Sequence, residues 1–144
     1  MLTNATTAWD YLDQCVLVAH RPGPLVDGDF GHFLDDMLQH DEVRSDVVRA
    51  SEGAPRADHR ASLLRWYREH SVRGAVLTNS VVARGGVTAL SWFGVPIKAL
   101  EPHELDAAFE YVRIPAARWP EARKRMQQIV SWVDGKPGVH TGVK

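Results

Sequence analysis

The feature that most constrains this chain is the alternation of short, Val-rich apolar runs with longer segments of helical periodicity. Four short runs bounded by turn-forming residues predict buried strands at 15–19, 47–51, 74–78 and 95–100. Apolar stripes at helical spacing predict five helices, with stripes over 30–38, 57–67, 82–93, 105–112 and 122–133. Strands that alternate with helices need crossover connections, which make parallel strand pairs. The expected fold is one α/β domain over 1–134, with a mainly parallel sheet of about four strands flanked by helices and an extra C-terminal helix.

Polar residues and prolines mark where the predicted helices begin. Asp27 can cap the first helix, and either Asn79 or Ser80 can cap the third. Pro102 and Pro120 each fit the first position of a helix, where a missing N–H does no harm. Gly135 is expected to end the last helix in the left-handed conformation.

The adjacent glycines Gly85 and Gly86 fall inside the third predicted helix. Each destabilises a helix by about 1 kcal/mol relative to alanine. We therefore expect another backbone to pack closely against this pair.

Composition excludes several classes of function. The net charge of −1 gives no general attraction to nucleic acid, and no apolar stretch approaches the ~20 residues that span a bilayer. Cys15 is the only cysteine, so an intramolecular disulfide and a Cys-rich zinc site are excluded, and its place on an apolar run predicts an inert, buried thiol. The N-terminus lacks the pattern of a secretory signal, which favours a cytoplasmic protein. The Gly-rich segment 135–144 is expected to be a flexible tail.

Polar residues follow the predicted strands and should meet at one edge, because the carboxyl ends of parallel strands lie together. The candidates are His20, Ser51, Glu52, Asn79, Ser80 and Arg84. Ser80 at a helix N-terminus with Arg84 one turn on could bind a phosphate or carboxylate, although helix capping alone also explains these residue types. His20 could act as a general base beside Ser51 or Glu52, but no Asp is spaced to orient its ring. No two histidines stand three or four residues apart. We predict no catalytic set, no metal site and no cofactor.

The run from Ala75 to Phe93 combines a strand, a serine at the turn and a helix with an early arginine, and Ile97–Ala108 follows it. Together with Ser51–Pro55, this run resembles the SpoIIAA-like branch of the STAS fold, small bacterial domains related to anti-sigma-factor antagonists. The resemblance covers roughly residues 45–115. It implies a non-catalytic regulatory or signalling module that binds a protein partner or forms a homodimer.

The resemblance also implies a role for one serine. In anti-sigma-factor antagonists, the serine at the start of the helix after a central strand is phosphorylated, and Ser80 is the matching residue here. The chain departs from the family's Asp-Ser-Ser-Gly run, since Thr78 and Asn79 precede Ser80, and Val81 and Val82 follow it.

Two surface features leave further alternatives open. Five tryptophans are many for 144 residues, and they indicate either core filling or an interface. The last helix carries a basic face, which acidic partners or solvent could meet: Arg118, Arg123, Lys124 and Arg125. Besides the regulatory module, the chain could therefore be a small anionic-ligand binder or enzyme with a pocket at the strand edge, or a homo-oligomeric assembly component.

Overall fold

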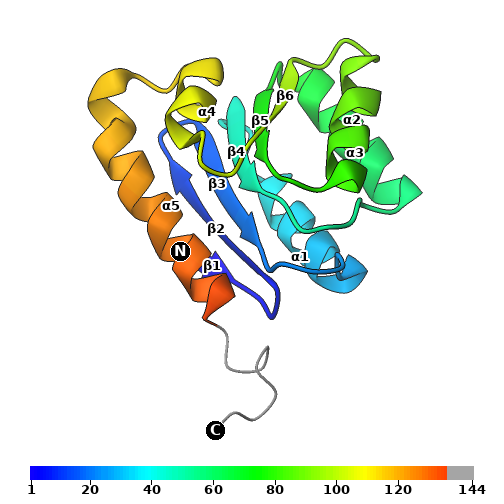
Figure 1. The fold of residues 1–144 in the computed structure, drawn as a ribbon. Coiled ribbons are helices and arrows are strands. Elements are labelled where there is room, and N and C mark those ends of the chain that lie inside the picture. The colour runs from blue at the N-terminus through cyan, green and yellow to red at the C-terminus, as the bar shows by residue number, and fades with distance from the viewer. Residues whose placement is uncertain (136–144) are drawn as a thin grey trace, which may run out of the picture.

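A computed structural model describes residues 1–135 as a six-stranded mixed sheet with helices on both faces (Figure 1). The strands follow one another across the sheet in chain order: β1 (Leu2–Thr3), β2 (Thr7–Leu12), β3 (Cys15–His20), β4 (Ser45–Arg49), β5 (Arg73–Leu77) and β6 (Ile97–Leu100). The helices are α1 (Asp27–Met37), α2 (Ala57–Glu69), α3 (Val81–Ser91), α4 (Leu105–Tyr111), a 3₁₀ turn (Ala116–Arg118) and α5 (Trp119–Asp134). The α/β class expected from the sequence is thus confirmed.

The prediction of a mainly parallel sheet of four strands is wrong, because an antiparallel N-terminal pair extends the sheet. Strand β2 pairs antiparallel with both β1 and β3, whereas β3, β4, β5 and β6 are parallel. A two-residue turn joins β2 to β3, and Asp13 in that turn has φ of 55°. Hairpin turns of two residues need such positive φ values, which Asp tolerates better than most residues.

Several predicted element ends also need correction. Strand β4 lies two residues earlier than expected, so that Ser51 falls in the loop that follows it. Pro102 does not open α4, because a turn occupies 101–104 and the helix begins at Leu105. Pro120 does lie at the start of α5, as predicted. Gly135 has φ of −91° and is not left-handed.

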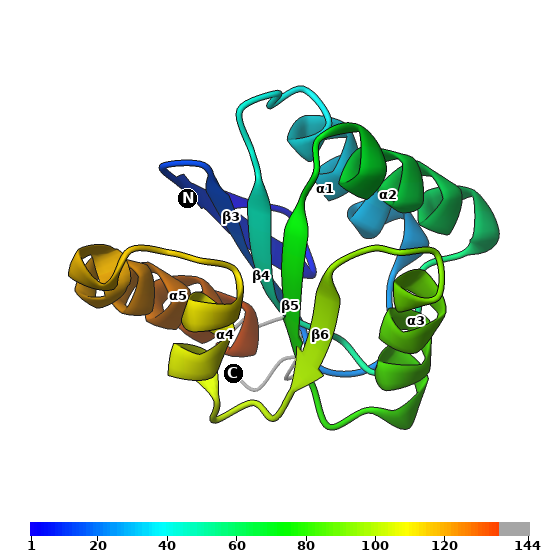
Figure 2. The same cartoon turned by 90° about the horizontal axis from the view of Figure 1, so that it is seen from above.

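Two layers of helices enclose the sheet. Helices α1, α2 and α3 connect the parallel strands and lie on one face, and α4 and α5 cover the other (Figure 2). Side chains alternate between the two faces along β3, since Cys15, Leu17 and Ala19 face α5 while Val16, Val18 and His20 face the other layer. The position of a residue along its strand therefore determines which helix layer its side chain meets.

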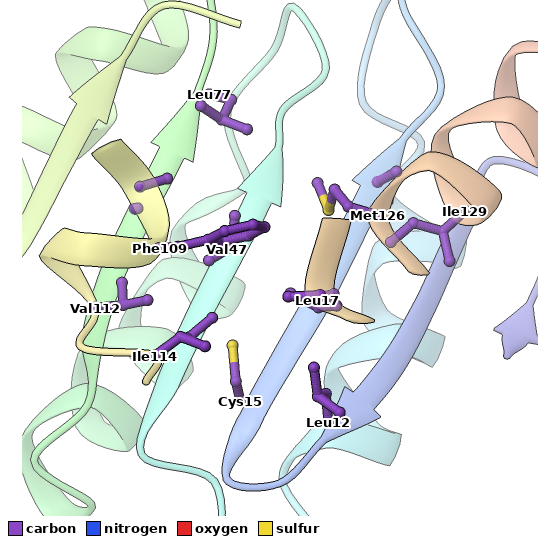
Figure 3. Close-up of a cluster of buried hydrophobic side chains, with 14 of the residues drawn as sticks. Leu12, Cys15, Leu17, Val47, Leu77, Phe109, Val112, Ile114, Met126 and Ile129 are labelled. Carbon is purple, nitrogen blue, oxygen red and sulfur yellow. The ribbon is translucent and has the colours of Figure 1, made fainter. Parts of the chain in front are cut away.

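The layer beneath α4 and α5 is a hydrophobic cluster built by both helices and the sheet. Phe109 of α4 and Met126 and Ile129 of α5 meet Leu17 and Val47 of the sheet, as Figure 3 shows. Cys15 is buried in this cluster, in agreement with the prediction, and burial raises the pKa of its thiol to about 12. Full burial of such side chains contributes about 1.5–3 kcal/mol each.

Within residues 1–135, no helix combines the length and apolarity needed to cross a bilayer. The tail predicted over 135–144 lies outside the described residues, except for Gly135.

Candidate functional site

The opposite face of the sheet holds a cavity of about 120 Å³ beneath α1, α2 and α3. Four strands and three helices line it, mostly with apolar side chains. These include Phe30, Phe33, Met37, Val48, Leu63, Val76, Val87, Leu90 and Ile97. Engineered apolar cavities of about 150 Å³ bind benzene-sized molecules. This cavity is somewhat smaller, which limits an occupant to about one small ring or a short branched chain.

The open side of the cavity lies near the start of α2. Arg60 is the exposed residue among its lining, and its guanidinium donates a hydrogen bond to the Pro55 carbonyl oxygen at 2.6 Å. The half-buried residues of segment 53–55 and Leu25 join Arg60 there. The most exposed part of the lining therefore lies between the loop after β4 and the first turns of α2.

A buried carboxyl lies in this apolar lining. Asp46 of β4 is 3% exposed, and the hydroxyl of Tyr67 donates a hydrogen bond of 2.7 Å to its Oδ2. The other oxygen, Oδ1, is buried without a hydrogen-bond partner among the described residues. Burial raises the pKa of Asp46 to about 7, while the Tyr67 hydrogen bond acts in the opposite direction. The same carboxyl and burial raise the pKa of Tyr67 well above its usual value, so its hydroxyl keeps its proton.

A glycine on the next strand leaves space for Asp46 and Tyr67. Gly74 of β5 is the direct partner of Asp46 in the sheet. A Cβ at Gly74 would lie 2.6 Å from Asp46 Oδ1 and 2.9 Å from the Tyr67 hydroxyl. Only glycine leaves space for both polar atoms beside the strand.

His20 at the end of β3 also lines this cavity. Its Nδ1 lies 3.0 Å from the hydroxyl of Thr7, and burial lowers its pKa to about 4. The Arg49 guanidinium contributes further to this lowering. Among the hydrogen bonds of residues 1–135, none joins His20 to Ser51 or Glu52. Ser51 lines the same cavity as His20, so the two residues border one space without a direct hydrogen bond.

The expectation that a backbone packs against the glycine pair of α3 is wrong. A Cβ at either Gly85 or Gly86 would have no atom within 4 Å. Gly85 is exposed, whereas Gly86 lines the cavity together with Ala83. The small residues on the inner face of α3 leave room beneath the helix instead of allowing a close contact.

A second, shallow groove of about 520 Å³ lies at the carboxyl ends of β4 and β5, where the sequence predicted a site. Ser51, Glu52, Asn79 and Ser80 all line it, so the structure brings four of the six candidate residues together. Ser51 lines both the groove and the apolar cavity. The other two candidates, His20 and Arg84, are not part of the groove lining.

Ser80 caps α3. Its Oγ accepts a hydrogen bond of 3.2 Å from the Ala83 N–H and donates one of 2.9 Å to the Glu52 carbonyl oxygen. Its hydroxyl thereby ties the loop after β4 to the start of the helix. The choice between Asn79 and Ser80 as the cap is settled in favour of Ser80.

The cations near the groove are engaged by carboxylates of the same chain. Arg84 contacts Glu101 at 2.9 Å, and Arg49 contacts Asp134 at 2.7 Å. Arg49 also donates to the His20 carbonyl oxygen. An anion at this edge would have to compete with these existing pairs.

The tryptophans divide between the two interpretations drawn from the sequence. Trp9 and Trp66 are buried in the layer beneath α1–α3, and Trp119 and Trp132 are partly buried against the other. Trp92, just after α3, is 81% exposed and is followed by the exposed Phe93. Core filling thus explains most of them, and Trp92 stands at the surface.

The basic face predicted for α5 is largely neutralised within the chain. Arg118 pairs with Asp13, Arg123 pairs with Asp106, and Arg125 pairs with Glu121 of the preceding turn. These contacts tie the helix to the β2–β3 turn and to α4. Ion pairs within the chain therefore account for most of the basic residues on this face.

Sequence reasoning missed Asp46, Tyr67 and Gly74 as site residues. A charged residue directly before the apolar pair Val47-Val48 was the available signal, since Asp is rarely found inside a buried strand. The cavity itself had no signal beyond the small residues Ala83 and Gly86 on the inner face of α3.

In the described part of the chain, no three His, Cys, Asp or Glu residues lie close enough together to hold a metal ion. No protein-family model matches the chain, and no curated protein matches it significantly.

Proposed function

We propose that this domain binds a small apolar molecule in the cavity beneath α1, α2 and α3. The observation that carries the proposal is a cavity of about 120 Å³, lined mostly by apolar side chains, within the core beneath α1, α2 and α3. A hollow of this size weakens a fold, because each cubic ångström of unfilled core destabilises it by about 24 cal/mol. An occupant would recover part of that loss by restoring contacts with the lining.

Two matched substitutions on α3 test the proposal. Gly86→Leu places a side chain into the cavity, whereas Gly85→Leu places the same side chain on the outer surface of the same helix. Toluene binding is followed by amide chemical shifts of the full chain during titration. We expect toluene to shift residues of the cavity lining, with affinity reduced at least about tenfold in Gly86→Leu and nearly unchanged in Gly85→Leu.

Circular dichroism spectra of both variants serve as the control for folding. Binding of toluene that is equally strong in both variants would place the ligand elsewhere and refute the proposal. No binding to the wild-type chain would refute it as well.

A second candidate is the protein-interaction module that the resemblance to SpoIIAA-like domains implies. It is favoured by four apolar side chains that are 56–84% exposed at the two ends of α3: Val81 and Val82 in its first turn, and Trp92 and Phe93 just after it. Large apolar side chains of this kind are enriched in interfaces. A second copy of the chain is the first partner to test.

Sedimentation velocity distinguishes a monomer of this chain from a dimer. If α3 mediates self-association, the wild-type chain sediments as a dimer at high concentration, and Trp92→Ser combined with Phe93→Ser sediments as a monomer. A wild-type chain that stays monomeric at every concentration would contradict self-association through this face. The predicted switch at Ser80 belongs to this candidate, because the modified hydroxyl could no longer donate to the Glu52 carbonyl oxygen.

A further inference from the structure

The buried carboxyl of Asp46 is the polar feature that the apolar cavity does not explain. Its Oδ2 is hydrogen-bonded to Tyr67, but its Oδ1 has no partner among residues 1–135. A buried polar atom without a partner costs about 1–3 kcal/mol, more when it is charged. Such groups are few in folded proteins, and each needs an explanation; the described residues have two others, His59 Nδ1 and Trp66 Nε1, neither of them on a residue that lines the cavity.

The titratable groups around Asp46 show which kind of partner its carboxyl lacks. The titratable residues that line the cavity with it, within the described chain, are Tyr67 of α2, His20 of β3 and Arg60 at the rim. Tyr67 and His20 are neutral near pH 7, and Arg60 is exposed, so no cation is buried beside the carboxyl. Cys15, on the other face of the sheet, keeps its thiol proton.

We infer that the occupant of this cavity is a small apolar amine, whose ammonium group pairs with Asp46 while its hydrocarbon part fills the space under α3. This inference rests on the proposed function and specifies its ligand. An ammonium group supplies both the hydrogen-bond donor that Oδ1 lacks and the positive charge that the cavity lacks. Asp46 has already been removed from water by folding, so binding adds only the desolvation of the amine.

The size of the cavity limits the hydrocarbon part. A cavity of about 120 Å³ limits the hydrocarbon part to no more than about one aromatic ring, since cavities of about 150 Å³ bind benzene. Benzylamine is therefore a suitable probe, toluene is the matched molecule without the donor, and phenylacetate is a molecule of similar shape with the opposite charge.

The experiment measures the affinity of all three probes for the full chain by titration near pH 8, where Asp46 is ionised. We expect benzylamine to bind at least about tenfold more tightly than toluene and phenylacetate to bind more weakly than either. Asp46→Asn should remove the preference for benzylamine and leave toluene affinity nearly unchanged. Toluene binding also reports that this variant is folded.

A measurement on the wild-type chain gives an independent readout. Between pH 6 and 8 the affinity for benzylamine should rise as Asp46 loses its proton, while the affinity for toluene stays constant. If toluene binds and Gly86→Leu blocks it, but benzylamine is no tighter than toluene, the amine inference is overturned and the proposed function stands. If no probe binds the wild-type chain, the proposed function itself fails.

Discussion

Gly74 shows how one residue without a side chain makes a buried polar pair possible. A Cβ at this position would lie 2.6 Å from Asp46 Oδ1 and would force the carboxyl or Tyr67 to move. We expect Gly74→Ala to lower the free energy of unfolding by about 1–3 kcal/mol, as overpacking does in other cores. Urea denaturation measures this change.

Gly86→Ala is the matched control for Gly74→Ala. A Cβ at Gly86 meets no atom within 4 Å, so the gain in helix propensity should raise stability by about 0.5–1 kcal/mol. Equal effects of the two substitutions would contradict the crowding described at Gly74.

Asp46 and His20 make opposite contributions to the dependence of stability on pH. Native Asp46 holds its proton up to about pH 7, whereas an unfolded Asp loses it near 3.9. The native state therefore binds more protons in this range, and the contribution of Asp46 to stability falls as pH rises. Native His20 loses its proton near pH 4 and an unfolded His near 6.5, so its contribution rises with pH over that interval.

Single variants should separate these two contributions. Relative to wild type, the stability of Asp46→Asn should increase as pH rises from 4 to 7, and that of His20→Asn should decrease from 4 to 6.5. Denaturation curves across this range test both directions. Parallel curves for all three proteins would show that neither group is titrated as the structure implies.

At the scale of the elements, α3 depends on the hydroxyl of Ser80 for its start. Ser80→Ala removes the cap on the Ala83 N–H and the hydrogen bond to the Glu52 carbonyl oxygen, so stability should fall by about 1 kcal/mol. Ser80→Asp retains an acceptor for the cap but loses the donor to Glu52. Its stability should therefore lie between that of the wild-type chain and that of Ser80→Ala. Chemical denaturation measures all three proteins.

Ser91→Ala, at the other end of α3, serves as the control for the cap. Ser91 is exposed and its Oγ donates only to the Thr88 carbonyl oxygen within the helix, so a change below about 0.5 kcal/mol is expected. A loss as large as that of Ser80→Ala would show that the position in the helix, and not capping, sets the effect.

The sequence predicted most of the elements because periodicity and turn residues report on local structure. All four parallel strands and five α-helices lie close to their expected positions. The strand Thr7–Leu12 was missed because Asp10 and Tyr11, which are only half-buried, interrupt an apolar run. Leu12-Asp13-Gln14-Cys15 could have indicated a hairpin, but Asp-Gln is a weak turn signal compared with Asn-Gly.

The candidate site was predicted less completely than the fold. Ser51, Glu52, Asn79 and Ser80 could be placed together because strand ends in a parallel sheet share an edge. The cavity could not be predicted, because its existence depends on how far α1, α2 and α3 stand from the sheet. That distance results from contacts between distant residues such as Tyr67 and Asp46, which local patterns do not contain.

At the scale of the whole molecule, the two faces of the sheet differ in how completely they are packed. The face beneath α4 and α5 is filled by side chains such as Phe109 and Met126, and the face beneath α1–α3 contains the cavity. Both faces carry a buried hydrophobic cluster, and the second also has the space for a ligand.

Cys15 provides a probe of the filled face. Because its thiol is buried and its pKa is raised to about 12, we expect a disulfide reagent to label it only when this half of the core opens. Labelling should be very slow in the native protein and should quickly reach one thiol per chain in denaturant. Rapid labelling without denaturant would contradict the close packing between α5 and the sheet.

The cavity also determines how the molecule responds to compression. Unfilled space in a native protein is lost on unfolding or when water enters, so hydrostatic pressure favours those states. This volume lies on one side of the sheet, beneath α1, α2 and α3, and Gly86 of α3 is part of its lining. Under pressure, the layer of α1, α2 and α3 should therefore deform before α5 separates from the opposite face.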